Sequence, residues 1–137
     1  MHFLKQLLAV AAIAVSAQAV AEPGITDNSI TLGMTSPFSG TNGVYGTDMR
    51  QVIQTYFDQV NKAGGVNGRK INLVALDDGY ETDRAVANTK SLINEKNVFA
   101  LLASYGSSPT TEAMNTVFGP AKVPLVGTIS GAGSLRE

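Results

Sequence analysis

The sequence contains no cysteine and a single histidine among its 137 residues. Without cysteine the chain can form no disulfide, no thiolate nucleophile and no cysteine-based zinc site, and it has no cysteine to carry a lipid. The one histidine, His2, lies in a segment that we expect to be removed, so the mature chain lacks the commonest general base and metal ligand. These absences favour a binding protein over an enzyme, with no cofactor and no metal site predicted.

A surplus of positive charge and a long apolar run are also missing. The chain has 10 Lys and Arg residues against 11 Asp and Glu residues, so no basic face indicates nucleic acid binding. Its most apolar run, residues 7–15, is shorter than the roughly 20 residues that a membrane-spanning helix requires. We therefore expect a soluble protein without a membrane span.

The first 21 residues have the organisation of a secretory signal peptide. Lys5 precedes the apolar run, and two overlapping small-x-small sites, ending at Ala19 and Ala21, precede Glu22. We predict cleavage after Ala21, which removes one basic residue and no acidic one, and a periplasmic location for the mature chain. A retained membrane anchor is the less favoured alternative.

Strand and helix patterns alternate through the rest of the chain. Apolar runs predict strands at residues 30–34, 71–76, 98–103 and 123–127, and helical spacing separates them. The run at 98–103 is apolar without alternation, as expected for a central strand covered on both faces. This alternation predicts an α/β fold with a doubly wound parallel sheet and right-handed crossovers. Ligands bind beyond the carboxyl ends of such strands, at residues 37–46, 77–81, 104–109 and 128–133.

The three helices have recognisable starts and inner faces. We expect Asp48 in the first turn of the first helix, Thr82 as the cap of the second, and Ser108 as the cap of the third with Pro109 as its first helical residue. The inner face of the first helix is expected at Met49, Val52, Ile53, Tyr56, Phe57 and Val60. The second is expected to bury Ala85, Thr89, Leu92 and Ile93, and the third Ala113, Met114, Val117, Phe118 and Ala121.

Residues 61–73 combine a helix exit, a double-glycine turn and a strand entry. Gly64 can adopt the left-handed conformation that ends a helix, and Asn67-Gly68 supplies a second tight turn before Ile71. Together with Gly43-Val-Tyr45-Gly46 and Asp77-Asp78, this joint resembles the leucine/isoleucine/valine-type periplasmic binding proteins, the solute receptors of ABC importers. The resemblance covers residues 29–136.

The resemblance implies a type I periplasmic binding fold, in which two Rossmann-like lobes hold the ligand between them. Chains of this family are more than twice as long, so residues 22–137 are expected to be the N-terminal part of the first lobe, an incomplete lobe preceded by the signal peptide at 1–21. The implied ligand is an amino acid of the branched-chain type or a similar small carboxylate or amide. The implied partners are the permease subunits of an ABC transporter.

The loop at 104–109 is the main candidate binding site. Ser107 and Ser108, beside the free N–H groups of a helix N-terminus, could hold a carboxylate, although a plain helix cap is the alternative. Tyr45 in its glycine-rich loop could cover a ligand side chain, or merely pack against the first helix. The resemblance assigns Tyr45 to the pocket, the carboxylate to Ser107 or Ser108, and the backbone end of the ligand to Ser130, Gly131 and Ala132.

Other motifs do not support chemistry. A serine hydrolase requires a G-x-S-x-G elbow and a histidine, which the mature chain lacks. Residues 64–70 follow a helix and open a strand, so they form a structural turn and not a phosphate loop, and residues 131–133 are a lone G-x-G. Asp77 and Asp78 could act as an acid/base pair or cation ligands, but a structural role is favoured, one bonding the next loop and one in water.

Two other functions remain open for such a chain. A sensory ligand-binding domain of the same fold hands its ligand signal to a membrane kinase. A flavodoxin-like enzyme would carry a phosphate-binding loop after its first strand, where residues 35–40 are loosely compatible.

Overall fold

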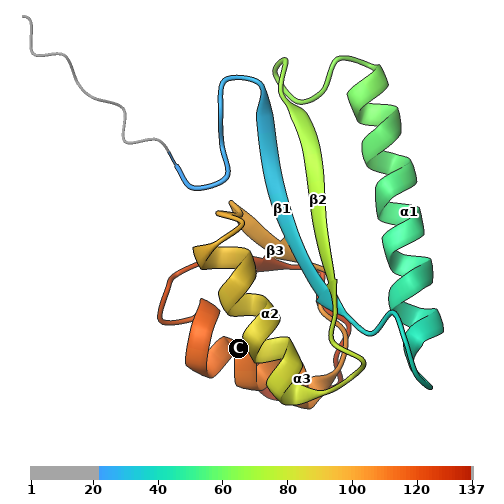
Figure 1. Cartoon of the computed structure of the whole chain (residues 1–137), viewed down its shortest axis with the longest axis vertical. Helices are drawn as coiled ribbons and strands as arrows, with labels where there is room; N and C mark the ends of the chain where they lie inside the picture. The colour runs from blue at the N-terminus through green and yellow to red at the C-terminus, as the bar shows by residue number, and fades with distance from the viewer. Residues whose placement is uncertain (1–21, 137) are drawn as a thin grey trace, which may run out of the picture.

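The computed structural model describes residues 22–136, so the predicted signal peptide lies outside the described residues (Figure 1). Strands and helices alternate, as predicted. The elements in chain order are β1 (Ser29–Ser36), α1 (Gly43–Lys62), β2 (Lys70–Asp77), α2 (Thr82–Asn94), β3 (Ala100–Leu102), α3 (Ser107–Ala113), a π-helical continuation (Met114–Phe118), β4 (Leu125–Val126) and a 3-10 turn (Gly133–Leu135). None of the described helices has the length and apolar character needed to cross a membrane.

The strands form one parallel sheet in the order β2-β1-β3-β4. β1 pairs with β2 along its whole length, from Ser29 opposite Lys70 to Ser36 opposite Asp77. β3 lies inside the sheet, as predicted for the apolar run that contains it. Because all strands are parallel, the loops that follow them gather at one edge, and the predicted α/β fold with a doubly wound parallel sheet is confirmed.

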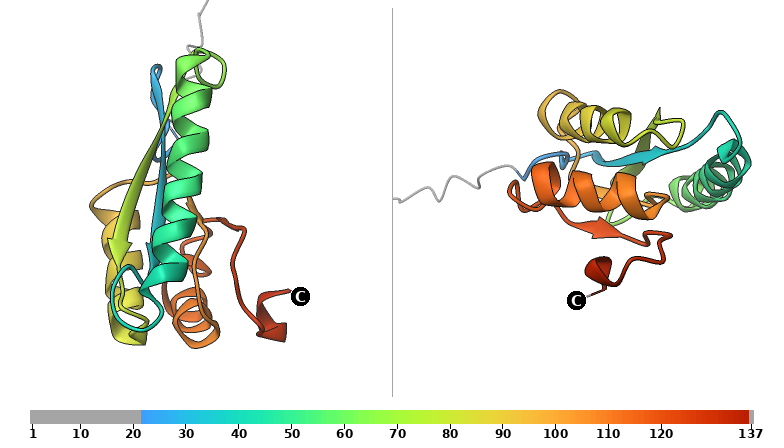
Figure 2. Two further views of the ribbon diagram at one scale, coloured as in Figure 1. Left: turned by 90° about the vertical axis from the view of Figure 1, so that its right-hand side faces the viewer. Right: turned by 90° about the horizontal axis from the view of Figure 1, so that it is seen from below.

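Helices lie on both sides of this sheet. α1 packs against β2, α2 packs against β1 and β2 from the opposite side, and α3 lies beside α2 (Figures 1 and 2). The second side carries the main core, built from Leu92, Val98, Leu101, Ala113 and Phe118. The predicted inner face of α2 is confirmed, since Ala85, Thr89 and Leu92 are buried and Ile93 packs against the core.

The glycine joint between α1 and β2 is built as predicted. Gly64, Asn67 and Gly68 all have positive φ angles, of 107°, 50° and 81°. Val66 and Arg69 exchange backbone hydrogen bonds of 2.8 and 3.0 Å across the Asn67-Gly68 turn. A side chain at Gly65 would bring its Cβ within 2.0 Å of the Arg69 carbonyl oxygen, so the turn requires glycine there.

Asn61, near the end of α1, fixes the helix to the first residues of β2. Its Nδ2 donates to the Ile71 carbonyl at 2.9 Å, and its Oδ1 accepts from the Ile71 N–H at 2.8 Å. The side chain therefore bonds both backbone polar groups of one strand residue.

The start of α1 differs from the prediction. The helix begins at Gly43 and not near Asp48, so Asp48 is outside the first turn, which holds no acidic residue. Gly46 lies so close to the chain leaving β1 that an added Cβ would be 1.9 Å from the Pro37 carbonyl oxygen. The glycines of this segment permit close packing of the helix start, whereas the sequence pattern had indicated a flexible loop.

Two of the six residues predicted for the inner face of α1 are exposed instead. Phe57 is buried, and Met49, Ile53 and Val60 are half-buried, but Val52 and Tyr56 are 69% and 62% exposed. Within residues 22–136, the element that α1 mainly contacts is β2, so one sheet strand covers only part of its apolar surface.

Both predicted helix caps are displaced. Glu81 precedes α2, so Thr82 is its first residue, and Gly106 precedes α3, so Ser108 is its second and Pro109 its third. Proline is tolerated there because the first N–H groups of a helix have no intrahelical acceptor. Ala121 is exposed because the helix ends in the π-helical segment at Phe118, although Ala113, Val117 and Phe118 are buried as predicted.

Candidate functional site

Four loops meet beyond the carboxyl ends of the strands. Asp77, at the end of β2, accepts hydrogen bonds from the Phe38 N–H and the Ser39 hydroxyl in the loop after β1. The loop after β4 is joined to the loop after β3, because the Ile129 N–H donates to the Ser104 carbonyl at 2.9 Å. The edge that sequence reasoning assigned to the ligand is therefore a continuous surface.

Three tyrosines form a cluster at this edge, Tyr45 from the first turn of α1 and Tyr80 and Tyr105 from the loops after β2 and β3. Tyr45 and Tyr105 are stacked, with ring centroids 5.3 Å apart and planes 8° from parallel. Tyr80 meets Tyr105 at 5.8 Å and a tilt of 59°. Tyr45 is 53% exposed and Tyr80 is 41% exposed.

Sequence reasoning chose only Tyr45 of this tyrosine cluster, and placed it in a loop although it lies in the first turn of α1. Tyr80 and Tyr105 were missed. The recurrence of an aromatic residue close after each of the first three strands was the pattern that could have identified them.

Next to the tyrosine cluster, two serines from separate loops are paired. The hydroxyls of Ser107 and Ser130 lie 2.9 Å apart, and the Ala132 N–H donates to the Ser130 hydroxyl at 3.0 Å. The structure thus brings together three of the predicted site residues. Gly131 lies exposed between Ser130 and Ala132.

Ser108 has different surroundings from its neighbour Ser107. Its side chain is exposed, and it borders a shallow hollow of ≈ 360 Å³ between the starts of α2 and α3. The other residues lining that hollow are Thr82, Ser107, Thr111 and Glu112. Of the two serines, only Ser107 therefore contacts Ser130.

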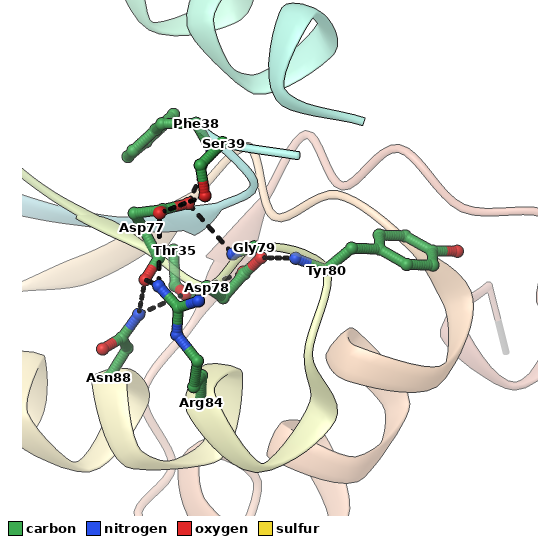
Figure 3. Close-up of polar contacts among 9 residues, drawn as sticks. All are labelled: Thr35, Phe38, Ser39, Asp77, Asp78, Gly79, Tyr80, Arg84 and Asn88. Carbon is green, nitrogen blue, oxygen red and sulfur yellow. Dashed lines mark hydrogen bonds and ion pairs between the residues drawn. The ribbon is translucent and has the colours of Figure 1, made fainter. Parts of the chain in front are cut away.

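Asp77 gathers donors from three directions (Figure 3). Besides Phe38 and Ser39, it accepts from the Gly79 N–H at 2.9 Å and from Arg84, whose guanidinium is 3.2 Å away. Burial favours the neutral carboxyl, but the hydrogen bonds from Ser39, Phe38, Gly79 and Arg84 outweigh it and hold the pKa of Asp77 well below its usual range. The ionised Asp77 joins the first two loops.

Asp78 faces the opposite side of the strand and is 1% exposed. It accepts from the Thr35 hydroxyl at 3.0 Å and from the Tyr80 N–H at 2.8 Å (Figure 3). Burial raises the pKa of Asp78 despite these bonds. The prediction that one of the two carboxylates lies in water was wrong, because both are engaged by protein groups. Within residues 22–136 no three His, Cys, Asp or Glu side chains converge on a possible metal position.

A small polar cavity of ≈ 10 Å³ lies beneath Tyr105. Asp78, Thr35, Ser104 and Thr110 contribute its polar lining. Thr110 is 3% exposed, and its hydroxyl has no hydrogen-bond partner among the described protein groups.

The chemistry offered at this edge is that of binding. Hydroxyl groups can donate to a carboxylate, and aromatic rings can cover an apolar group. The Ser107–Ser130 pair has no histidine beside it in the described part of the chain, which contains none.

Comparison with known proteins agrees with this geometry. The model of the periplasmic binding protein family matches residues 29–136. The leucine-, isoleucine-, valine-, threonine- and alanine-binding protein of Pseudomonas aeruginosa is 31% identical over 111 residues, covering 80% of this chain and 29% of that protein.

Two solved structures are also similar. The substrate-binding protein of a branched-chain amino acid transporter from Streptococcus pneumoniae, in complex with isoleucine, shares 30% identity, with a TM-score of 0.73 over 79% of this chain and 31% of that one. A fatty acid ABC transporter substrate-binding protein from Thermomonospora curvata shares 34% identity, with a TM-score of 0.70 over 80% of this chain and 27% of that one.

The chain spans between 18% and 29% of the length of the curated relatives that it matches. The family match, however, extends from the first residue of β1 to the end of the described structure. The parallel sheet, the glycine joint and the loops at the carboxyl edge all fall within it. The chain belongs to the periplasmic binding protein family.

Proposed function

We propose that this chain is part of a solute-binding protein of an ABC importer. Residues 22–137 form the N-terminal part of its first lobe, and residues 1–21 are the signal peptide that directs it to the periplasm. The protein holds an amino acid of the branched-chain type, or a similar small carboxylate or amide, and presents it to the permease subunits without chemical change.

One observation carries the proposal. The loops after all four strands converge at the carboxyl edge, and they place hydroxyl groups beside exposed aromatic rings. This edge is where open parallel sheets bind ligands. A ligand with a carboxylate and an apolar side chain is recognised by hydroxyl groups that donate to the carboxylate and by aromatic rings that cover the side chain, and both must lie close together.

We assign roles to the site residues on this basis. The hydroxyls of Ser107 and Ser130 and the backbone around Gly131 and Ala132 hold the polar end of the ligand, and Tyr45 covers its side chain. Ser108 contributes less, because its side chain is exposed and the Ser130 hydroxyl is hydrogen-bonded to Ser107.

The relatives support the ligand class. The Pseudomonas protein is named for five aliphatic or hydroxylated amino acids, and the Streptococcus structure contains isoleucine. The Thermomonospora protein is named for fatty acids, so a carboxylate is the feature common to these ligands.

The test is a thermal-shift screen of the full-length gene product against amino acids and small carboxylates, followed by calorimetry. A ligand that binds only the native state raises the free energy of unfolding, by about 2.7 kcal/mol when its concentration is one hundred times Kd, and therefore raises Tm. We expect at least one amino acid or small carboxylate to raise Tm and to be recovered chemically unchanged. Absence of binding across the screen, or turnover of a bound compound, would refute the proposal.

The location is tested separately on protein recovered from the periplasm. We expect its intact mass to correspond to a chain that begins at Glu22, because the small-x-small site ends at Ala21. An intact Met1 would contradict this.

A further inference from the structure

Within the described structure, neighbouring groups hold part of the tyrosine cluster in place. Gly106, with φ of 102°, supports it, because a Cβ there would be 2.5 Å from the Tyr80 ring. Tyr80 is held in turn by its N–H bond to the buried Asp78. The backbone around Tyr80 therefore positions its ring before any ligand binds.

The stacked pair leaves one flat surface open. Tyr105 contacts both other rings, whereas Tyr45 is covered on one face by Tyr105 and has 53% of its surface exposed. An aromatic ring has a negative face and a positive edge, so it prefers an offset-stacked or edge-on aromatic neighbour. An aromatic group that binds on the uncovered face of Tyr45 would add a third ring to the Tyr45–Tyr105 stack.

We infer that the ligand of this site carries a flat aromatic group, which stacks on the Tyr45–Tyr105 pair while its carboxylate binds at Ser107 and Ser130. The inference rests on the proposed function, a binding protein for an amino acid or small carboxylate, and specifies an aromatic amino acid or an aryl carboxylate in place of a branched-chain amino acid. Tyr105 lies two residues before Ser107 and pairs with Ile129, the neighbour of Ser130, so the stack lies beside the serine pair.

An aliphatic side chain would gain less at the same place. It can bury area against a ring, but it lacks the quadrupole that favours stacking. Aromatic pairs are stabilised beyond their buried area by an amount equivalent to about a two- to tenfold gain in affinity. Side chains that are already ordered lose little conformational entropy when the ligand binds, so the gain in affinity from stacking is not offset by an ordering cost.

The test compares three ligands on the full-length gene product by calorimetry: L-phenylalanine, L-cyclohexylalanine and L-leucine. Cyclohexylalanine has nearly the size and apolar surface of phenylalanine but no aromatic face. We expect phenylalanine to bind about two- to tenfold more tightly than cyclohexylalanine, and Tyr45→Leu and Tyr105→Leu each to reduce that ratio toward one.

Tyr56→Leu is the control, because Tyr56 is also an exposed tyrosine of α1 but lies outside the tyrosine cluster. It should leave the ratio unchanged. Equal affinity for phenylalanine and cyclohexylalanine, or tighter binding of leucine, would overturn the inference while leaving the proposed function intact. Binding of no amino acid or carboxylate in the wider screen would instead overturn the proposed function.

Discussion

At the scale of single residues, Asp77 at the end of β2 and Asp78 directly after it have opposite electrostatic surroundings. Asp77 receives four donors, and its pKa is lowered, whereas burial raises the pKa of Asp78. The strand alternation that turns adjacent side chains to opposite faces explains the difference. One carboxylate is a charged link between two surface loops, and the other is a buried acceptor beneath the tyrosine cluster.

Asp77→Asn should lower the free energy of unfolding by about 1 to 3 kcal/mol at neutral pH, since it weakens hydrogen bonds to a charged group. A lowered folded pKa contributes stability above the unfolded value, near 3.9, and loses it as the pH falls through the folded pKa. The deficit of the variant should therefore shrink below about pH 4. Chemical denaturation at pH 7 and pH 3 measures it, with the exposed Asp27→Asn as control. A deficit as large at pH 3 as at pH 7 would argue against a role for the charge.

Thr110→Val should raise Tm, because the buried hydroxyl that it removes has no protein partner. The matched control is Thr89→Val, on a threonine equally buried in a helix but bonded to the Ala85 carbonyl at 2.7 Å. That variant should lose about 0.5 to 1.5 kcal/mol. If Thr110→Val instead destabilises the protein as Thr89→Val does, the Thr110 hydroxyl has a partner in solution, such as a water in the small polar cavity.

Part of this description of single residues could be predicted from the sequence. It indicated that Asp77 and Asp78 are structural, because no third carboxylate stands at metal-ligand spacing. It could not indicate that Asp78 is buried or that Tyr105 stacks on Tyr45, since both depend on which loops the sheet order brings together. Ser107 and Ser130 are 23 residues apart, and the paired hydroxyls likewise follow from the position of β4 beside β3.

At the scale of elements, the start of α1 depends on close contact with the chain that leaves β1. Gly46→Ala should destabilise the protein by about 1 to 3 kcal/mol, the usual cost of overpacking, although alanine is the better helix former. Gly133→Ala is the control, because a Cβ there meets nothing within 4 Å. Thermal unfolding followed by circular dichroism measures both. A more stable Gly46→Ala variant would show that helix propensity outweighs the contact with Pro37.

Sequence reasoning was accurate for the glycine joint and inaccurate for the helix starts, for one physical reason. At the joint, Gly64, Asn67 and Gly68 are required by local backbone geometry, which the residue types report directly. At Gly43 and Gly46, glycine is required by a tertiary contact, and the same residue type is then indistinguishable from a loop glycine. The first helix was predicted to begin five residues too late as a result.

At the scale of the whole molecule, the proposed site has groups on only one side of the ligand within residues 22–136. Binding proteins that enclose a ligand exclude water from it and contact it on both faces, whereas a one-sided site orders the ligand for fewer contacts. Residues 22–137 alone should therefore give no measurable binding at micromolar concentration by calorimetry. The full-length gene product is the comparison, and a micromolar Kd for residues 22–137 would contradict this expectation.

The two hydrogen bonds of Asn61 have a consequence for the molecule in a crowded compartment. Among the described strands β2 lies at one edge of the sheet, and the N–H and C=O of Ile71 point outward, away from β1. Exposed groups of this kind are the template on which a strand of another chain can pair. Asn61 occupies both of them, so at this point the side chain of α1 protects the protein against edge-to-edge aggregation.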